Sequence, residues 1–442
     1  MDLDKNGRDK FSMPTAASIV VANMIGTGVF TSLGFQLLDI QSAPVILLLW
    51  VVGGVLALCG ALCYSELGAA LPRSGGEYNF LTEIYHPAAG FISGWISTTI
   101  GFAAPTALAA ITAATYLSAV WPHVSTTLVA VVLVTVVGLA HLGSRTGSAR
   151  FQLFFTGLKL LLILLFVVLA WWSAPELQTV RWLFSGEDVG LVTSGAFAIA
   201  LIYVNYAYTG WNAATYLAGE MHQPNRTLPK VLLVGTGLVM LVYVLLHVMF
   251  LSVAPMTAMA GQLEIGYVVA DFAFGSAGAG AVGLMLALLL VSTVSAMVLA
   301  GPRALQVIGQ DFAVLGFLSR ENRHGVPWVA IVFQTGMTLL LVITSTFDAI
   351  LVFASFTMAF NTLMAVLGVA VLRKRRPDID RPFRVPWYPI PLLIYSGITL
   401  WTLVFVLWER PQEAGFGVGL IVLGWLFYRV ARARVPAHSE LS

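Results

Sequence analysis

The chain has 442 residues, of which 58% are hydrophobic and only 10% are charged. Soluble domains carry about 25% charged residues, so this chain has too few charges to cover a surface that faces water. A net charge of +2 without a basic patch gives no sign of nucleic-acid binding. The composition is typical of an integral membrane protein.

Twelve apolar stretches are long enough to be transmembrane helices, which need about 20 residues. In chain order they cover residues 15–38, 44–69, 88–119, 126–142, 147–173, 190–219, 229–254, 267–300, 328–346, 348–373, 387–408 and 414–432. The first 12 residues are polar, and no small-residue cleavage site precedes the first stretch, so no removable signal peptide is expected. We expect a single all-α transmembrane domain over residues 1–442.

Lysine and arginine residues sort by side if the N-terminus is cytoplasmic and the chain crosses the membrane twelve times. Of the 23 such residues, Arg181 and Arg410 then fall in outside segments and Lys159 lies within the membrane, while all the others are inside. This distribution follows the positive-inside rule. It predicts that both termini are cytoplasmic, and it supports the number of spans.

The first and sixth stretches are each interrupted by glycine. "GTGVF" (26–30) puts two glycines and a threonine inside the first, and "YVNYAYTGWNAATY" (203–216) puts Gly210 among polar and aromatic residues in the sixth. Glycine-interrupted segments in matching positions of two halves indicate a transporter site. Because each half begins with one of them and contains five spans, an odd number, the halves have opposite topology. We expect an inverted repeat over 13–173 and 190–376, followed by two additional helices in 386–434.

The interruptions predict a particular ligand. In hydrocarbon, each unpaired backbone N–H or C=O group costs about 2–7 kcal/mol. Free amides attract a carboxylate and free carbonyls attract an ammonium group, so a site with both fits a zwitterionic amino acid. Gly26 and Gly28 would let the main chain approach the ligand, and Thr27 adds a hydroxyl. The alternative is that the two glycines only permit close helix packing.

Six motifs, in order and at fitting positions, resemble the amino acid–polyamine–organocation (APC) superfamily of transporters, and most of all the bacterial relatives of the L-type amino acid transporters. They are "MIGTGVF" (24–30), "YSELGAALPRSGGEYNFL" (64–81), "YAYTGWN" (206–212), "QPNRTLP" (223–229), "GPRALQVIGQD" (301–311) and "RPFRVPWYPIP" (381–391). The resemblance implies a LeuT-type fold with discontinuous helices 1 and 6, alternating access without ATP or any other cofactor, and a bacterial inner (plasma) membrane location.

The resemblance also implies that the substrate binds at the two interruptions, at Met24, Ile25, Gly26, Thr27, Gly28, Tyr206, Ala207, Thr209 and Asn212. Its carboxylate is expected at Thr27 and Gly28, and its ammonium group at carbonyls near residues 24–25 and 206–209. Tyr206 occupies the position of a gating aromatic residue, or is an ordinary core tyrosine. Asn212 either touches the ligand or stabilises the interruption.

Lys159 lies in the fifth stretch, about 13 Å deeper than Arg150 at the helical rise. Its long side chain could return to the cytoplasmic interface. The sharper hypothesis is that it binds carbonyls at the first interruption and replaces a sodium ion between spans one and eight, as the resemblance to sodium-independent relatives suggests. Because burial favours neutral lysine, it could also carry a proton. The hydroxyls of Ser292, Thr293 and Ser295 could lie nearby, or could bond only their own backbone. No metal site is expected.

The acidic residues Glu66, Glu220 and Asp271 fall near span ends, and we find none at mid-membrane depth. A cationic substrate side chain would then lack a charge partner, which favours neutral L-amino acids, taken up by exchange or with protons. The alternative is a transporter or antiporter of cationic amino acids or polyamines. A channel is a distant alternative because no selectivity filter is evident, and no catalytic motif indicates an enzyme.

The two cysteines, Cys59 and Cys63, lie one turn apart in an apolar stretch and are expected to be buried thiols. The outside segment "VWPHVS" (120–125) contains no cysteine. Eukaryotic L-type transporters have one there that links a glycoprotein partner. We therefore expect no disulfide-linked heavy-chain subunit.

Overall fold

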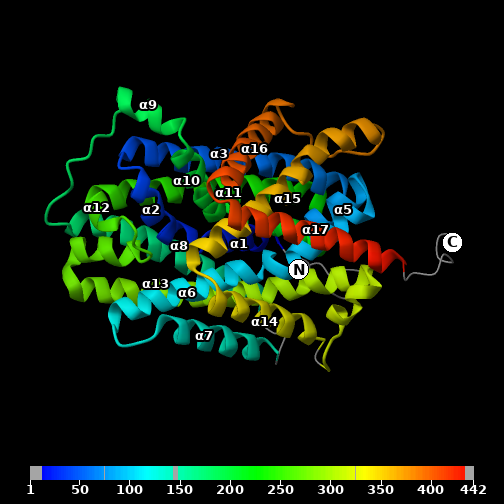
Figure 1. Cartoon of the computed structure of the whole chain (residues 1–442), viewed down its shortest axis with the longest axis horizontal. Coiled ribbons are helices and arrows are strands. Elements are labelled where there is room, and N and C mark those ends of the chain that lie inside the picture. The colour runs from blue at the N-terminus through cyan, green and yellow to red at the C-terminus, as the bar shows by residue number, and fades with distance from the viewer. Residues whose placement is uncertain (1–11, 74, 143–147, 324, 434–442) are drawn as a thin grey trace.

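A computed structural model describes residues 12–73, 75–142, 148–323 and 325–433. All regular elements in these ranges are helices, and the long ones run roughly side by side along the longest axis of the molecule (Figure 1). Within these ranges, nine helical segments are long and apolar enough to cross a membrane, and the bent pair α9 (Gly186–Val192) and α10 (Gly195–Tyr208) forms one further candidate. Two shorter apolar helices, α7 (Thr126–His141) and α14 (Trp328–Thr344), complete the set of twelve that the sequence predicts.

The first half of the chain contains two helices in place of one at its first span. Its helices are α1 (Met13–Met24), α2 (Gly28–Asp39), α3 (Ala43–Ala70), α4 (Glu77–Ile84), α5 (Pro87–Ile96), a π-helix (Ser97–Gly101), α6 (Ala103–Val120), α7 (Thr126–His141) and α8 (Ser148–Ser173). The π-helix lies between α5 and α6 within the third span. Such widened turns are frequent at functional sites.

The second half is also interrupted at its first span, between α10 and a 3-10 helix. Its helices are α9 (Gly186–Val192), α10 (Gly195–Tyr208), a 3-10 helix (Ala213–Glu220), α11 (Pro224–Val253), α12 (Met256–Met259), α13 (Ile265–Asp311), a second 3-10 helix (Ala313–Ser319), α14 (Trp328–Thr344) and α15 (Phe347–Arg375). Two more helices follow, α16 (Ile390–Glu409) and α17 (Pro411–Ala433).

The predicted all-α fold with discontinuous first and sixth spans is confirmed, and most span ends agree within a few residues. The eighth span differs. It was expected to end at residue 300, but α13 continues to Asp311, and Gly275 interrupts it with a φ of 71°. The extension was missed because Pro302 and Arg303 resemble the start of a loop, whereas tertiary packing keeps both residues helical.

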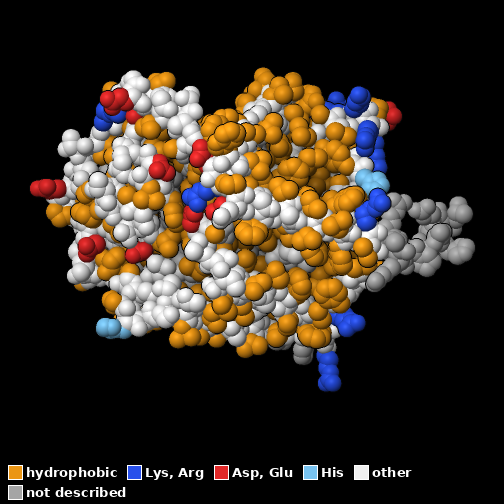
Figure 2. Space-filling model, viewed as in Figure 1, with side chains coloured by type: hydrophobic (Ala, Val, Ile, Leu, Met, Phe, Trp, Pro, Cys, Tyr) orange, Lys and Arg blue, Asp and Glu red, His pale blue; other side chains and the backbone are white. Residues whose placement is uncertain are grey.

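On the face that Figure 2 shows, charged side chains separate toward the two ends of the molecule. Lysine and arginine gather mainly at one end, acidic residues mainly at the other, and apolar side chains cover the surface between them. Lys5, Arg8, Lys10, Arg145 and Arg434, which the sequence assigned to the basic side, lie outside the described residues. The separation is the pattern expected of a protein whose basic end faces the cytoplasm.

Partly buried ion pairs fix helices that do not contain the interruptions. At the basic end, the Glu66 carboxylate of α3 accepts hydrogen bonds from Arg373 of α15, at 2.6 Å, and from the Val385 amide, at 2.7 Å. At the other end, Arg410 contacts Asp348 at 2.9 Å. These contacts hold α3, α15 and the additional helices as a frame around the two broken spans.

Candidate functional site

The first interruption lies between α1 and α2, and two glycines there have different surroundings. Gly28 abuts the end of α10, and a Cβ at this position would lie 2.4 Å from the Ala207 Cα. Gly26 has more space, because its nearest neighbour would be the Thr293 Cγ2 at 3.6 Å. Both glycines lie on the wall of a cavity, but only Gly28 is also needed for close helix packing.

The second interruption lies between α10 and the 3-10 helix at Ala213–Glu220, directly against the first. Gly210 has a φ of 100°, which other residue types rarely adopt. A Cβ there would also lie 2.8 Å from the Asn23 carbonyl carbon and oxygen. The two interruptions thus contact each other twice, at Gly28 with Ala207 and at Gly210 with Asn23.

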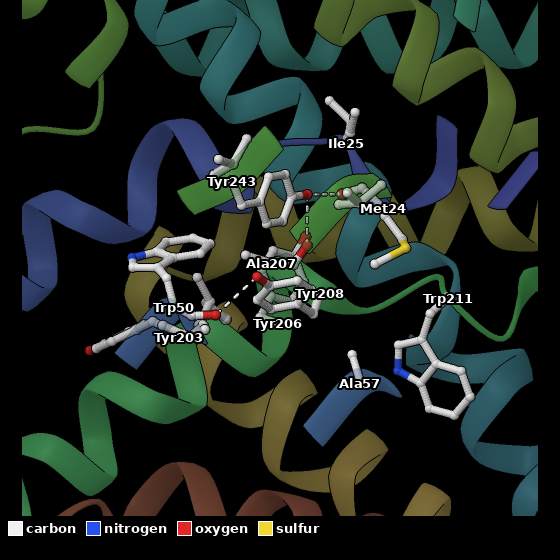
Figure 3. Packing of buried hydrophobic residues seen from close by; sticks show 14 of the residues in the cluster. Met24, Ile25, Trp50, Ala57, Tyr203, Tyr206, Ala207, Tyr208, Trp211 and Tyr243 are labelled. Carbon is white, nitrogen blue, oxygen red and sulfur yellow. Dashed lines mark hydrogen bonds between the residues drawn. The ribbon is translucent and has the colours of Figure 1, made fainter. Parts of the chain in front are cut away.

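Side chains from neighbouring helices satisfy the carbonyl groups that the interruptions release. The Tyr243 hydroxyl of α11 lies 2.6 Å from the Met24 oxygen and 2.9 Å from the Ala207 oxygen, so it bridges both broken spans (Figure 3). The Lys159 ammonium of α8 donates to the Ile25 oxygen at 2.9 Å.

The amide groups of the first interruption are different. Gly26, Thr27 and Gly28 donate no backbone hydrogen bond to any acceptor in the described ranges. They precede and begin α2, so the helix dipole adds positive potential at the same place. Three unpaired amides at a helix N-terminus form a site for an anionic group such as a carboxylate.

A cavity of about 130 Å³ lies beside both interruptions. The residues that line it come from α1, α2, α4, the third span, the second interruption, α13 and α15. They include Ile19, Asn23, Met24, Gly26, Thr27, Gly28, Glu77, Ser97, Phe102, Tyr206, Ala207, Thr209, Asn212, Tyr216, Thr293, Met297, Arg303, Val307 and Asn361. Since Arg303 and Val307 lie toward the C-terminal end of α13, the cavity extends toward the basic end of the molecule.

Tyr206 of α10 also lines this cavity and is buried. Its hydroxyl lies 3.3 Å from the Thr27 hydroxyl, so the ring is fixed across the two interruptions. Further out, Tyr203 of the same helix donates to Asp348 at 2.6 Å, and its ring stacks on Phe35. These contacts close the cavity on the side away from the basic end.

The sequence-predicted binding residues come together, with one exception. Of the nine, Ile25 does not line the cavity, because its carbonyl points to Lys159 instead. Asn212 lines the wall, and its amide donates to Glu77 at 2.6 Å. The Tyr206 carbonyl already accepts two hydrogen bonds, from the amide and the hydroxyl of Thr209. The carbonyls of Met24 and Ala207 share the single proton of the Tyr243 hydroxyl. A carbonyl oxygen has two lone pairs, so these two carbonyls keep the capacity to accept from an ammonium group.

The predicted cation-replacing group is only partly assembled. Lys159 is buried and donates to the Thr293 hydroxyl at 3.1 Å, so α8, α13 and the first interruption meet at its ammonium group. Ser292 bonds its own helix at Leu289. Ser295 pairs with His141 of α7 at 2.9 Å. The structure therefore does not place either serine with Lys159, because on a helix of 3.6 residues per turn neighbouring positions point in different directions.

The sequence shows no acidic residue at mid-membrane depth within the predicted spans, but an acid from outside those spans reaches the cavity. Glu77, the first residue of α4, is buried and lines the cavity. It was missed because its segment was assigned to an inside loop. Its carboxylate accepts hydrogen bonds from Tyr64, at 2.9 Å, and from Asn212 and Tyr216. Three protein donors leave this carboxylate little capacity for a substrate cation.

Two other residues of the site were missed. Tyr243 had no local signal, since a tyrosine in an apolar span is usually a core residue. Arg303 stood in a motif quoted for resemblance, and the expected end of span eight hid its place on the cavity wall. For Glu77, the signal was the pair Gly75 and Gly76, whose positive φ angles turn the chain back toward the bundle.

Comparison with known proteins points in one direction. A family described as "Amino acid permease" matches residues 11–427. The large neutral amino acids transporter small subunit 2 of Mus musculus is 28% identical, over 94% of this chain and 80% of that protein. The cystine/glutamate transporter of Homo sapiens is also 28% identical, over 94% and 83%. The b(0,+)-type amino acid transporter 1 of Mus musculus is 26% identical, over 93% and 85%.

Substitution of the two glycines of the first interruption should have unequal effects. Gly28→Ala forces a Cβ into Ala207 and should destabilise the protein by about 1–3 kcal/mol. Gly26→Ala meets only ordinary contacts and should leave the melting temperature of the purified protein nearly unchanged. Thermal unfolding in detergent measures both. Equal melting temperatures for the two variants would contradict the packing role of Gly28.

Glu77→Gln should loosen the second interruption. The glutamine side chain has one acceptor oxygen in place of the two oxygens of the carboxylate. One of the donors Tyr64, Asn212 and Tyr216 therefore loses its acceptor, at a cost of about 1–3 kcal/mol. We expect a lower melting temperature and slower transport. The control is Glu83→Gln on the same helix, where the exposed pair with Arg376 is worth about 0–1 kcal/mol. An effect of Glu77→Gln no larger than that of the control would refute the network.

Proposed function

This chain belongs to the amino acid permease family, and from that premise we propose that it transports neutral L-amino acids without sodium by alternating access, by exchange or with protons. It is a multi-pass membrane transporter rather than an enzyme. The observation that carries the substrate proposal is the group of three unpaired amides at Gly26, Thr27 and Gly28, residues that line a cavity beside two broken helices.

The geometry supports a specific orientation of the substrate. The carboxylate binds the amides at the start of α2, with the Thr27 hydroxyl beside them. The ammonium group binds the remaining lone pairs of the carbonyls of Met24 and Ala207, whereas the Tyr206 carbonyl is already occupied by the amide and the hydroxyl of Thr209. Thr209 and Asn212 border the same space, and Gly26 leaves it open. Tyr206 closes the site on the side away from the basic end and opens when the substrate enters from there.

A neutral substrate side chain follows from the charges on the cavity wall. The Glu77 carboxylate is occupied by three donors, so a lysine or arginine side chain gains little from it. The relatives named for large neutral amino acids fit this preference. The relative named for cystine and glutamate shows that the same fold also accommodates other side chains. A transporter of cationic amino acids or polyamines is the alternative.

Lys159 supports transport without sodium. Its ammonium group is placed between the Ile25 carbonyl and the Thr293 hydroxyl, where a free cation would otherwise be needed to neutralise these oxygens. A proton that accompanied the substrate inward would gain about 2.3 kcal/mol per 100 mV of membrane potential. Lys159 is the proposed residue for such coupling, and exchange of internal for external amino acid is the other mode.

The remaining features of the proposal concern organisation and location. The inverted repeat comprises residues 13–173 and 190–376, with additional helices in 386–434, in one transmembrane domain. The basic end faces the cytoplasm with both termini, in a bacterial inner membrane. No disulfide-linked subunit is needed, because Cys59 and Cys63, the only two cysteines, are buried within α3.

Uptake by the purified chain alone in liposomes tests the function. The panel is labelled L-leucine, L-alanine, L-glutamate, L-lysine and L-arginine, each with and without internal amino acid, a pH gradient, and sodium replaced by choline. We expect saturable uptake of the neutral members that is unchanged in choline. Strict dependence on internal amino acid would establish exchange. A preference for arginine or lysine, or loss of uptake in choline, would refute the proposal.

Lys159→Ala should abolish most transport while the protein still inserts in the membrane. The variant leaves the Ile25 carbonyl without a donor and loosens the contact between α8 and the first interruption, so we expect at least a tenfold loss of rate, equivalent to about 1.4 kcal/mol. Thr293→Val is the matched control, since it keeps the bond to Ile25 and should retain more activity. Uptake by Lys159→Ala at the wild-type level across the pH range would exclude the coupling role.

A further inference from the structure

The cavity is longer than the site that the unpaired amides define. The residues of α13 that line it are Thr293, Met297, Ala300, Ala304 and Val307. They recur every three or four positions, so one face of this helix borders the cavity over about 21 Å at the helical rise. An amino acid at the amides of Gly26 to Gly28 occupies only the Thr293 end of this face.

Arg303 lies at the other end of the same cavity and is only partly buried. Within the described ranges, its guanidinium makes no hydrogen bond or ion pair with any side chain or carbonyl. Arginines nearby are paired instead. Arg73 contacts Asp311 at the end of α13, and Arg373 contacts Glu66. Glu77, the acid on the same cavity wall, is held by Tyr64, Asn212 and Tyr216 rather than by Arg303.

A partly desolvated guanidinium without an anion is unfavourable, and its planar donors match a carboxylate in particular. The proposed substrate carries a carboxylate and has to pass Arg303 to reach the basic end of the molecule. Apolar surface from Ile19, Phe102 and Val307 lies around the passage, which keeps the field of the guanidinium strong.

We propose that Arg303 forms a second, inner binding position for the carboxylate of the transported amino acid, used on arrival from and departure to the cytoplasmic side. This inference rests on the proposed function. The substrate carboxylate moves from the amides at the start of α2 to the Arg303 guanidinium, which lies about 15 Å further along α13 than Thr293. The inner position lowers the free energy of the substrate between the central site and water.

The test separates the two faces of the membrane. Right-side-out and inside-out vesicles that contain the full chain are loaded with L-leucine. The half-saturating concentration of external L-leucine is then measured in each, so that each orientation reports one face of the transporter. Arg303→Gln should raise the value at the cytoplasmic face about tenfold, which corresponds to one charge-assisted hydrogen-bonded contact, and change the value at the other face less than twofold. Arg303→Lys should give an intermediate value, since it keeps the charge and loses the planar fork.

The control is Arg320→Gln, an exposed arginine at the same end that does not line the cavity, and it should change neither value. Equal changes at both faces, or none, would overturn the inner position.

Replacement of internal chloride by gluconate distinguishes binding of the substrate carboxylate at Arg303 from binding of a small inorganic anion there. The proposal would also be overturned if Arg303 bound chloride instead of leucine. In that case the half-saturating leucine concentration at the cytoplasmic face would depend on chloride in the wild type but not in Arg303→Gln, and the substitution itself would not change leucine binding. Absence of saturable leucine uptake in the wild type would instead refute the proposed substrate.

Discussion

The requirement that backbone polar groups be paired inside a membrane governs this structure. A helix that stops at mid-membrane leaves N–H and C=O groups whose exposure to hydrocarbon costs about 2–7 kcal/mol each. Here two helices stop, at Met24 and at Tyr208, and they stop against each other. Contact between Gly28 and Ala207 and between Gly210 and Asn23 excludes lipid from both ends at once. Neither interruption would be tolerable without the other.

The pairing of these groups is uneven, and the unevenness gives the site its polarity. Donors from intact helices reach the released carbonyls, namely the Tyr243 hydroxyl and the Lys159 ammonium group. Tyr243 is held in turn by an edge-on contact with Trp50. No protein acceptor reaches the amides of Gly26 to Gly28 within the described ranges. The site therefore offers its strongest unfilled capacity to an anionic group, and a weaker, shared capacity to a cationic one.

A few hydrogen bonds join the two broken helices to each other and to α4, which are the elements around the cavity that must rearrange during transport. Glu77 ties α4 to the second interruption through Asn212 and Tyr216, and Tyr206 ties the second interruption to Thr27. Each tie is one or two hydrogen bonds, so it can be broken and remade at a modest cost in free energy. Alternating access requires such rearrangement at the broken helices.

The sequence alone determined the twelve spans, the sorting of basic residues to one end and the positions of both interruptions. These depend on local properties, namely hydropathy over about 20 residues and glycine within an apolar run. The tertiary structure decided which side chains meet there. Thr293 rather than Ser292 or Ser295 reaches Lys159, and Glu77 rather than a membrane-embedded acid lies on the cavity wall. Such contacts join residues more than a hundred positions apart, and they depend on the rotation and crossing of packed helices, which no local pattern records.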